Sequence, residues 1–198
     1  MRSLKLNIFE ATEPQLSPAK GRVLIAEPFL EEPFFKRSIV YLTEFNKKGA
    51  IGFVLNKSSE LYPDEVIEDL FNFRGKLYVG GPVESNSLHY IHTLGTQIEG
   101  SVRISDSIYW GGDFEQIKKY INMGQANENN VKFFAGYSGW STGQLEHEII
   151  EKSWVVADVD DLFVLNNHVD DLWPKLLNEM GGDVYRSWSN FPHNPAFN

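Results

Sequence analysis

The sequence predicts an α+β fold: a large curled mixed, mostly antiparallel sheet with about four helices packed around it. Nine short segments are rich in strand-forming residues, and four others carry helix signals. The strand segments occur in adjacent groups rather than in strict alternation with helices, which favours α+β over α/β. With 198 residues, 42% of them hydrophobic, the chain is long enough for one domain with a substantial core.

We expect an N-terminal arm over residues 1–20 and one domain over residues 21–198. Polar residues interrupt the apolar ones at the start of the arm, and Pro14 and Pro18 follow, as in a linker. The arm lacks the ~7–15 apolar residues in a row that a secretion signal needs. No later segment approaches the ~18 apolar residues of a membrane span. We therefore expect a cytoplasmic protein.

The predicted strands begin with a buried run and a hairpin. Asn46–Gly49 separates two strand-forming segments, and its Asn and Gly suit a tight turn. Strands are expected at residues 22–26, 38–45, 50–55, 76–79, 88–94, 102–110, 131–135, 154–157 and 162–165.

The predicted helices have recognisable ends. Asp113 with Gln116, and Ser141 with Gln144, have the spacing of a capping box, in which two side chains satisfy the first backbone N–H groups. Glycines follow three of the apolar stripes, as at many helix ends. Helices are expected at about residues 63–74, 113–123, 141–150 and 171–180.

Composition excludes several kinds of function. The chain has no cysteine, so it has no disulfide framework, no thiolate zinc site and no cysteine nucleophile. Eighteen Lys and Arg face 27 Asp and Glu, which gives a formal charge of −9. That balance disfavours specific binding to nucleic acid or to a membrane surface, since both need dense positive charge.

The segment Gly136–Trp140 (GYSGW) is the strongest candidate for catalysis. It follows a predicted strand and precedes a predicted helix, as the nucleophilic serine of a G-x-S-x-G motif does. The final glycine of that motif is Trp140 here, and no His–acid pair can be assigned to Ser138. We therefore interpret the segment as a tight turn in which Gly136 or Gly139 has positive φ and Trp140 enters the core. A hydrolase that uses Ser138 or a His–Glu pair remains the alternative.

Metal and nucleotide sites are not indicated. His89 and His92 are three residues apart on a predicted strand, so they face opposite sides of it. His147 and Glu151 share a helix face, but two ligands are too few for a tight site. The turns at Gly80–Gly81–Pro82 and Gly111–Gly112–Asp113 lack a phosphate-binding lysine. We expect no cofactor and no metal.

Several motifs in order resemble one bacterial family. The chain is similar to the YqgE/AlgH family from about Gly21 to Asn198. The motifs are Pro33–Ser38, Asn46–Asn56, Gly80–Val83 with Leu88–His89, Gly136–Trp140 with Gly143–Glu148, Trp154, Trp173 and Asn194–Asn198.

The resemblance implies a compact α+β fold but no established reaction, cofactor or substrate. Some members carry a label of transcriptional regulator, although this chain shows neither a helix-turn-helix nor a basic face. The family motif accepts Ala at the position of Ser138, which counts against a nucleophilic serine.

Three hypotheses follow: a binding or regulatory module without catalysis, a hydrolase, or a DNA-binding regulator. We favour the first, with an unidentified protein or small molecule as ligand, because polar groups beside tight glycine turns can converge on a ligand. The predicted ligand groove consists of Asn56, His89, Tyr137, Gln144 and Glu146. The residues expected to shape the fold around it are Gly80, Gly81, Pro82, Gly136, Gly139, Trp140 and Gly143.

Overall fold

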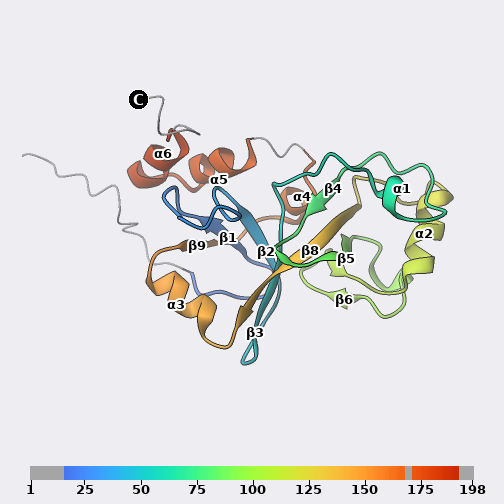
Figure 1. The fold of residues 1–198 in the computed structure, drawn as a ribbon, viewed down its shortest axis with the longest axis horizontal. Coiled ribbons are helices and arrows are strands. Elements are labelled where there is room, and N and C mark those ends of the chain that lie inside the picture. Colours follow the sequence, from blue (N-terminus) through green and yellow to red (C-terminus); the bar gives the residue numbers. More distant parts are fainter. Residues whose placement is uncertain (1–15, 168–170, 192–198) are drawn as a thin grey trace, which may run out of the picture.

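The protein folds around one open sheet that curls across the molecule (Figure 1). A computed structural model describes residues 16–167 and 171–191. It confirms the α+β class with a mostly antiparallel sheet, and β4–β8 is the parallel pair. The strand order is β6-β7-β5-β8-β3-β2-β1-β9, with β4 also paired to β8. The strands are β1 (Val23–Ala26), β2 (Ile39–Asn46), β3 (Gly49–Val54), β4 (Leu77–Val79), β5 (Val83–His92), β6 (Val102–Arg103), β7 (Tyr109–Trp110), β8 (Val131–Ser141) and β9 (Trp154–Ala157).

Six α-helices, rather than about four, are present in the described residues. They are α1 (Pro63–Val66), α2 (Phe114–Asn122), α3 (Gln144–Ile150), α4 (Asp161–Val164), α5 (Leu172–Met180) and α6 (Asp183–Ser189), with a 3-10 turn at Gly95–Gln97. The strand predicted at residues 162–165 is wrong: it is helix α4, because Asp160 caps it by accepting a hydrogen bond from the backbone N–H of Phe163. The predicted helix from Pro63 stops after one turn, since Ile67 is already extended.

Strand β8 is the centre of the sheet and is twice as long as predicted. It pairs with β5 and β4 along its first half and with β3 along its second half. Figure 1 shows it running from the side of α2 to the side of α3. The GYSGW segment is therefore strand and not a turn, and the predicted turn is wrong. Gly136 does have positive φ (66°), but this produces an irregularity within the strand.

The chain crosses β8 at Gly80–Gly81, because β4 and β5 lie on opposite sides of that strand. The crossing brings backbone against backbone. A Cβ atom on Gly81 would lie 2.0 Å from the carbonyl carbon and oxygen of Tyr137, and one on Gly80 would lie 2.4 Å from the oxygen of Gly136. Glycine is therefore required at both positions of the crossing. Pro82 follows at the surface, while Gly139 lies in β8 without positive φ.

Trp140 is in the core, as predicted, with 6% of its surface exposed. It packs in a cluster with Leu145 of α3 and Trp154 of β9. The predicted cap by Ser141 is wrong. Gly143, with φ of 76°, is the N-cap of α3, and Ser141 ends β8 instead. Gln144 does reach back, as predicted, and accepts a hydrogen bond from the backbone N–H of Ser141 at 3.0 Å.

The end of the predicted arm contacts the domain. Arg22 donates to the carbonyl of Ser17 at 2.6 Å, and Lys20 donates to the carbonyl of Arg103 at 2.9 Å. Residues 1–15 and the predicted motif Asn194–Asn198 lie outside the described residues. None of the described helices is long and apolar enough to span a membrane.

Candidate functional site

The structure separates the five predicted groove residues into three places. His89 and Tyr137 contact each other edge to face, with ring centroids 5.7 Å apart. Asn56 lies elsewhere, and its amide binds the backbone of Ile39 and Arg37. Gln144 and Glu146 are on α3, where Gln144 donates to Glu148. The predicted groove does not form as one site.

A cavity of about 460 Å³ lies beside His89. Its walls come from the middle of β5, the end of β7, a glycine turn and the first residue of α2. The lining residues are Leu88, His89, Tyr90, Trp110, Gly111, Gly112 and Phe114. Four of them carry aromatic rings. We name this cavity the aromatic pocket.

His89 is half-buried in this wall. Its Nε2 atom lies 2.8 Å from the hydroxyl of Ser87. Burial lowers the pKa of His89, and the opposing charge of Glu84 does not cancel that effect. The imidazole is therefore neutral at pH 7 and presents a flat, uncharged ring to the pocket.

Trp110 forms the neighbouring wall, and the rings of Phe53 and His89 pack against it. Its ring centroid lies 5.9 Å from that of Phe53 and 6.5 Å from that of His89. Phe53 in turn stacks on Phe134 of β8 at 4.8 Å. Because this aromatic stack continues into the main core, the pocket wall is rigid.

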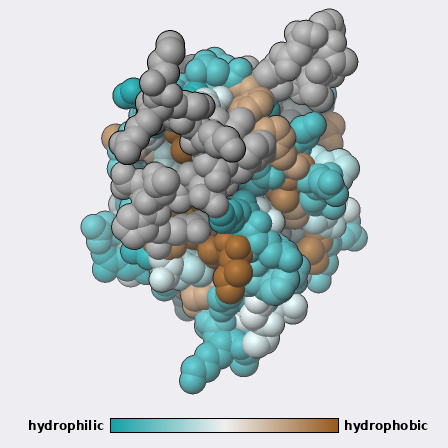
Figure 2. Space-filling model, turned by 90° about the vertical axis from the view of Figure 1, so that its left-hand side faces the viewer, coloured by the Kyte–Doolittle hydropathy of each residue, from teal (hydrophilic) through white to brown (hydrophobic). Residues whose placement is uncertain are grey.

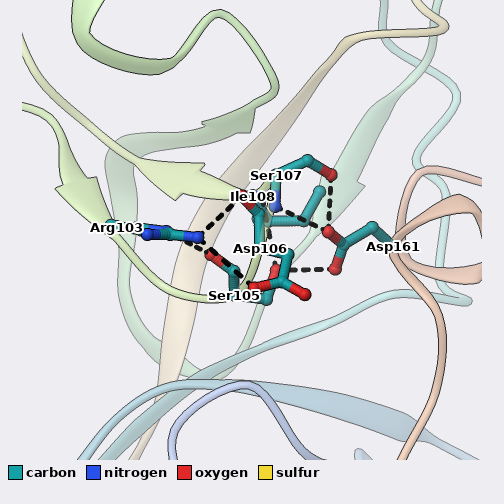
Figure 3. A network of polar contacts seen from close by, with 6 residues as sticks. All are labelled: Arg103, Ser105, Asp106, Ser107, Ile108 and Asp161. Carbon is teal, nitrogen blue, oxygen red and sulfur yellow. Dashed lines mark hydrogen bonds and ion pairs between the residues drawn. The ribbon is translucent and has the colours of Figure 1, made fainter.

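A carboxylate fixes the loop that leads to Trp110. Asp161, the first residue of α4, accepts hydrogen bonds from the hydroxyl of Ser105 at 2.6 Å and from the backbone N–H of Ser107 at 2.8 Å (Figure 3). Arg103 binds the same loop through the carbonyls of Ser105 and Asp106. Burial would raise the pKa of Asp161, but these hydrogen bonds and the charge of Arg103 outweigh it and lower the pKa.

The glycine turn after Trp110 shapes the third wall. Gly111 and Gly112 both have positive φ, 64° and 105°. A Cβ on Gly112 would lie 2.7 Å from the side chain of Ile98, so this position needs glycine. The turn places Phe114 at the pocket, and Asp113 caps α2 by accepting from the backbone N–H of Gln116, as predicted.

A second cavity, of about 780 Å³, is the one that Asn56 lines, together with Glu32 and Lys57. Its polar groups are engaged with the protein: both amide atoms of Asn56 bind backbone, and Lys57 donates to the carbonyl of Phe34. Burial lowers the pKa of Lys57, with the charge of Glu32 opposing it. These contacts indicate a structural role, so we treat the aromatic pocket as the candidate site.

The catalytic alternatives find little support. Ser138 is fully buried, and its hydroxyl donates to the carbonyl of Gly80 at 3.0 Å. His147 and Glu151 form an exposed pair at 3.4 Å on α3. Among the described residues, no group of three or more His, Asp or Glu side chains could hold a metal ion.

Hydrophobic surface on the face that includes α3 is broken into separate areas by hydrophilic residues, as the coloured part of Figure 2 shows.

Sequence reasoning missed most of the pocket. The sequence predicts a strand that ends at Trp110, a helix that contains Phe114 and a turn at Gly111–Gly112, but no local pattern joins these residues in one site. The one available signal was that a glycine pair stands between two large aromatic residues.

Fold and site together define a class: an α+β protein with one curled sheet and an aromatic pocket at the edge of that sheet. The AlgH-like family model matches residues 23–185. A UPF0301 protein of Cytophaga hutchinsonii is 44% identical over 182 residues, covering 90% of this chain and 98% of the relative. One from Parabacteroides distasonis is 40% identical over 194 residues, covering 97% and 98%. The chain therefore belongs to the YqgE/AlgH family, whose function is not established.

Solved structures agree with this assignment. The solution structure of the AlgH protein from Pseudomonas aeruginosa has a TM-score of 0.69 at 25% identity, covering 92% of this chain and 100% of that one. A crystal structure of a Corynebacterium diphtheriae protein has a TM-score of 0.75 at 24% identity, covering 90% and 95%, and shows the same fold.

Proposed function

We propose that this protein is a binding module of the bacterial cytoplasm without catalysis, and that the aromatic pocket receives a planar apolar group of its ligand. This proposal rests on the structure of the pocket, in which the neutral ring of His89 and the indole of Trp110 lie together on a rigid wall. Aromatic rings of this kind bind a flat ligand group by stacking and by excluding water.

The contact between Ser87 and His89 supports binding rather than hydrolysis. The Ser87 hydroxyl donates its one proton to the carbonyl of Glu84 at 2.7 Å. His89 must then donate from Nε2 to the Ser87 oxygen. A nucleophilic serine needs the reverse, a histidine that accepts the serine proton. The pair orients the imidazole ring and does not activate the hydroxyl.

Indole is a suitable probe, because it is planar, neutral and small enough for the pocket. We expect indole to shift the amide signals of residues 88–90 and 110–114 in a ¹H–¹⁵N NMR titration. Trp110→Ala and Phe114→Ala should each weaken indole binding by at least about tenfold, which is about 1.4 kcal/mol. Phe71→Ala, at a side chain that is 59% exposed outside the pocket, is the matched control and should change nothing.

Shifts elsewhere in the protein, or full indole affinity in both pocket variants, would overturn the proposal. Thermal unfolding of each variant shows whether it is folded. Since Phe114 is half-buried at the start of α2, Phe114→Ala remains informative if Trp110→Ala unfolds.

A further inference from the structure

We infer that the ligand of the aromatic pocket is an extended peptide that adds as a strand to the open edge of β5, with an apolar or aromatic side chain in the pocket and basic residues beside it. This inference rests on the proposed function and specifies its ligand. It concerns the backbone of β5 as well as the aromatic rings.

Strand β5 is covered along only part of one edge. Within the described residues, β7 pairs with it at Ile91 and His92, and the N–H of Gly111 donates to the carbonyl of Tyr90 at 3.0 Å. At Gly111 and Gly112 the chain then turns away toward α2. The next residue along β5 that lines the pocket at this edge is Leu88.

The backbone N–H and C=O groups of Leu88 point toward the pocket rather than toward β8. Leu88 stands opposite Ala135, and the carbonyl of Ala135 accepts a hydrogen bond from Gly80 on the other side of β8. Leu88 and Ala135 are thus a pair without hydrogen bonds between them. Tyr90, two residues on, also faces β7 with its carbonyl, and residues two apart in a strand share an edge. The hydrogen bonds of Ala135 and of Tyr90 therefore indicate independently that the N–H and C=O of Leu88 point away from β8.

An added peptide strand would satisfy this edge. Its backbone can pair with the N–H and C=O of Leu88, continuing the ladder that β7 begins. Its side chains alternate between the two faces of the sheet, so that one of them can pack against the rings of His89 and Trp110. Strand addition combines these two contacts, since main-chain pairing gives affinity and a side-chain pocket gives specificity.

The acidic groups near the pocket indicate that the peptide carries basic residues on both sides of its anchor. The carboxylate of Glu84 acts electrostatically on His89, and that of Asp113 acts on Tyr90, so acidic groups face two lining residues of the pocket. The chain as a whole carries a formal charge of −9. A peptide with lysines on both sides of its anchor is electrostatically complementary to this surface.

The probe is the peptide lysine–valine–phenylalanine–valine–lysine, acetylated and amidated, with two N-methylated twins. One twin is methylated on the backbone nitrogens of the two valines. The other is methylated on the backbone nitrogens of the two lysines and the phenylalanine. Only alternate N–H groups of an added strand face β5, so one twin should lose binding by at least about tenfold and the other should bind nearly as well as the parent peptide. A version with glutamates in place of the lysines should bind more weakly than the parent.

Two variants at one position test the protein side. Leu88→Pro removes the N–H that faces the pocket, whereas Leu88→Ala changes the side chain and keeps the N–H. Because Leu88 lines the pocket, Leu88→Ala should weaken the peptide and indole to a similar extent. Leu88→Pro should weaken the peptide at least about tenfold more than it weakens indole, because it also removes the N–H that pairs with the added strand. If Leu88→Pro does not fold, the N-methylated twins still show whether the peptide adds as a strand to β5.

The outcomes separate the two proposals. Equal binding of the parent and both twins, with indole still bound, overturns strand addition and leaves the pocket proposal standing. Failure of both indole and the peptides to bind overturns the pocket proposal and with it this inference. If the free protein is a dimer that Leu88→Pro converts to a monomer, the occupant is a second copy of this chain, and the peptide ligand is overturned.

Discussion

The indole ring of Trp140 packs edge to face against that of Trp154, with centroids 5.9 Å apart and planes at 81°. Both indole N–H groups donate to the same oxygen of Glu148, each at 2.8 Å. One carboxylate on α3 therefore joins the end of β8 to β9. Since charged acceptors make strong hydrogen bonds, this contact fixes α3 against the sheet.

Trp140→Ala should destabilise the protein by about 3–5 kcal/mol, because it removes a buried aromatic ring and leaves a cavity beside Trp154. Chemical denaturation measures this change. Trp140→Phe keeps most of the packing and loses only the N–H to Glu148, so it should cost about 1–3 kcal/mol. A denaturation midpoint for Trp140→Ala equal to that of the parent would show that the ring does not hold the fold.

Gly81→Ala should be strongly destabilising, by about 3 kcal/mol or more, since its new Cβ would overlap the carbonyl of Tyr137 at the crossing of β8. Gly139→Ala is the matched control. Gly139 lies in β8, the strand that the chain crosses at Gly81, and has no positive φ. The nearest neighbour of a Cβ at Gly139 would be the ring of Tyr137 at 3.2 Å, which can shift. The control should cost less than about 1 kcal/mol. Equal denaturation midpoints for the two variants would contradict the crossing.

The stability of the protein should rise with pH between about 7 and 10, because of Lys132. Its side chain is buried against the ring of Tyr78, with Nζ 2.7 Å from the carbonyl of Asn166. Burial lowers the pKa of Lys132 to about 7. Above that pH the unfolded chain holds a proton that the folded protein has released, so stability increases until the ordinary lysine pKa of 10.5 is reached.

The expected gain in the free energy of unfolding is on the order of 3 kcal/mol from pH 7 to 9.5. Urea denaturation across this range measures it, and Lys132→Met should flatten the profile. Burial raises the pKa of Tyr78 and of Tyr90 to about 12, so these phenols oppose the trend only above pH 10. A parent protein with the same pH profile as the methionine variant would show that Lys132 is charged in the fold.

Ser138→Ala should leave the fold intact and cost only about 0.5–1.5 kcal/mol, the loss of one hydrogen bond to Gly80. The carbonyl of Gly80 keeps a second donor, the backbone N–H of Val54 at 2.9 Å. Circular dichroism and denaturation measure the effect. An ester hydrolysis rate that disappears in the folded variant would establish a catalytic serine instead.

The purified protein should not bind duplex DNA specifically at about 150 mM salt, since its formal charge is −9 and its lysines and arginines do not cluster in the sequence. A gel-shift titration with a pool of short duplexes measures this. Saturable retardation that depends on the sequence of the duplex would favour the DNA-binding regulator.

Local signals in the sequence determined much of the framework. The hairpin at Asn46–Gly49 and the cap of Asp113 follow from the backbone preferences of single residues and their nearest neighbours. The burial of Trp140 and Trp154 follows from their large apolar surfaces. The absence of cysteine and the acidic charge need no structure at all.

Only the tertiary structure decided the length of β8 and the location of the pocket. Glycines at 136 and 139 have the local signature of a turn, but pairing with β3 and β5 extends the strand through them. His89, Trp110 and Phe114 line one cavity because β7 folds back onto β5 and a glycine turn leads into α2. Strand pairing and desolvation join residues that are distant along the chain, so no local pattern contains them.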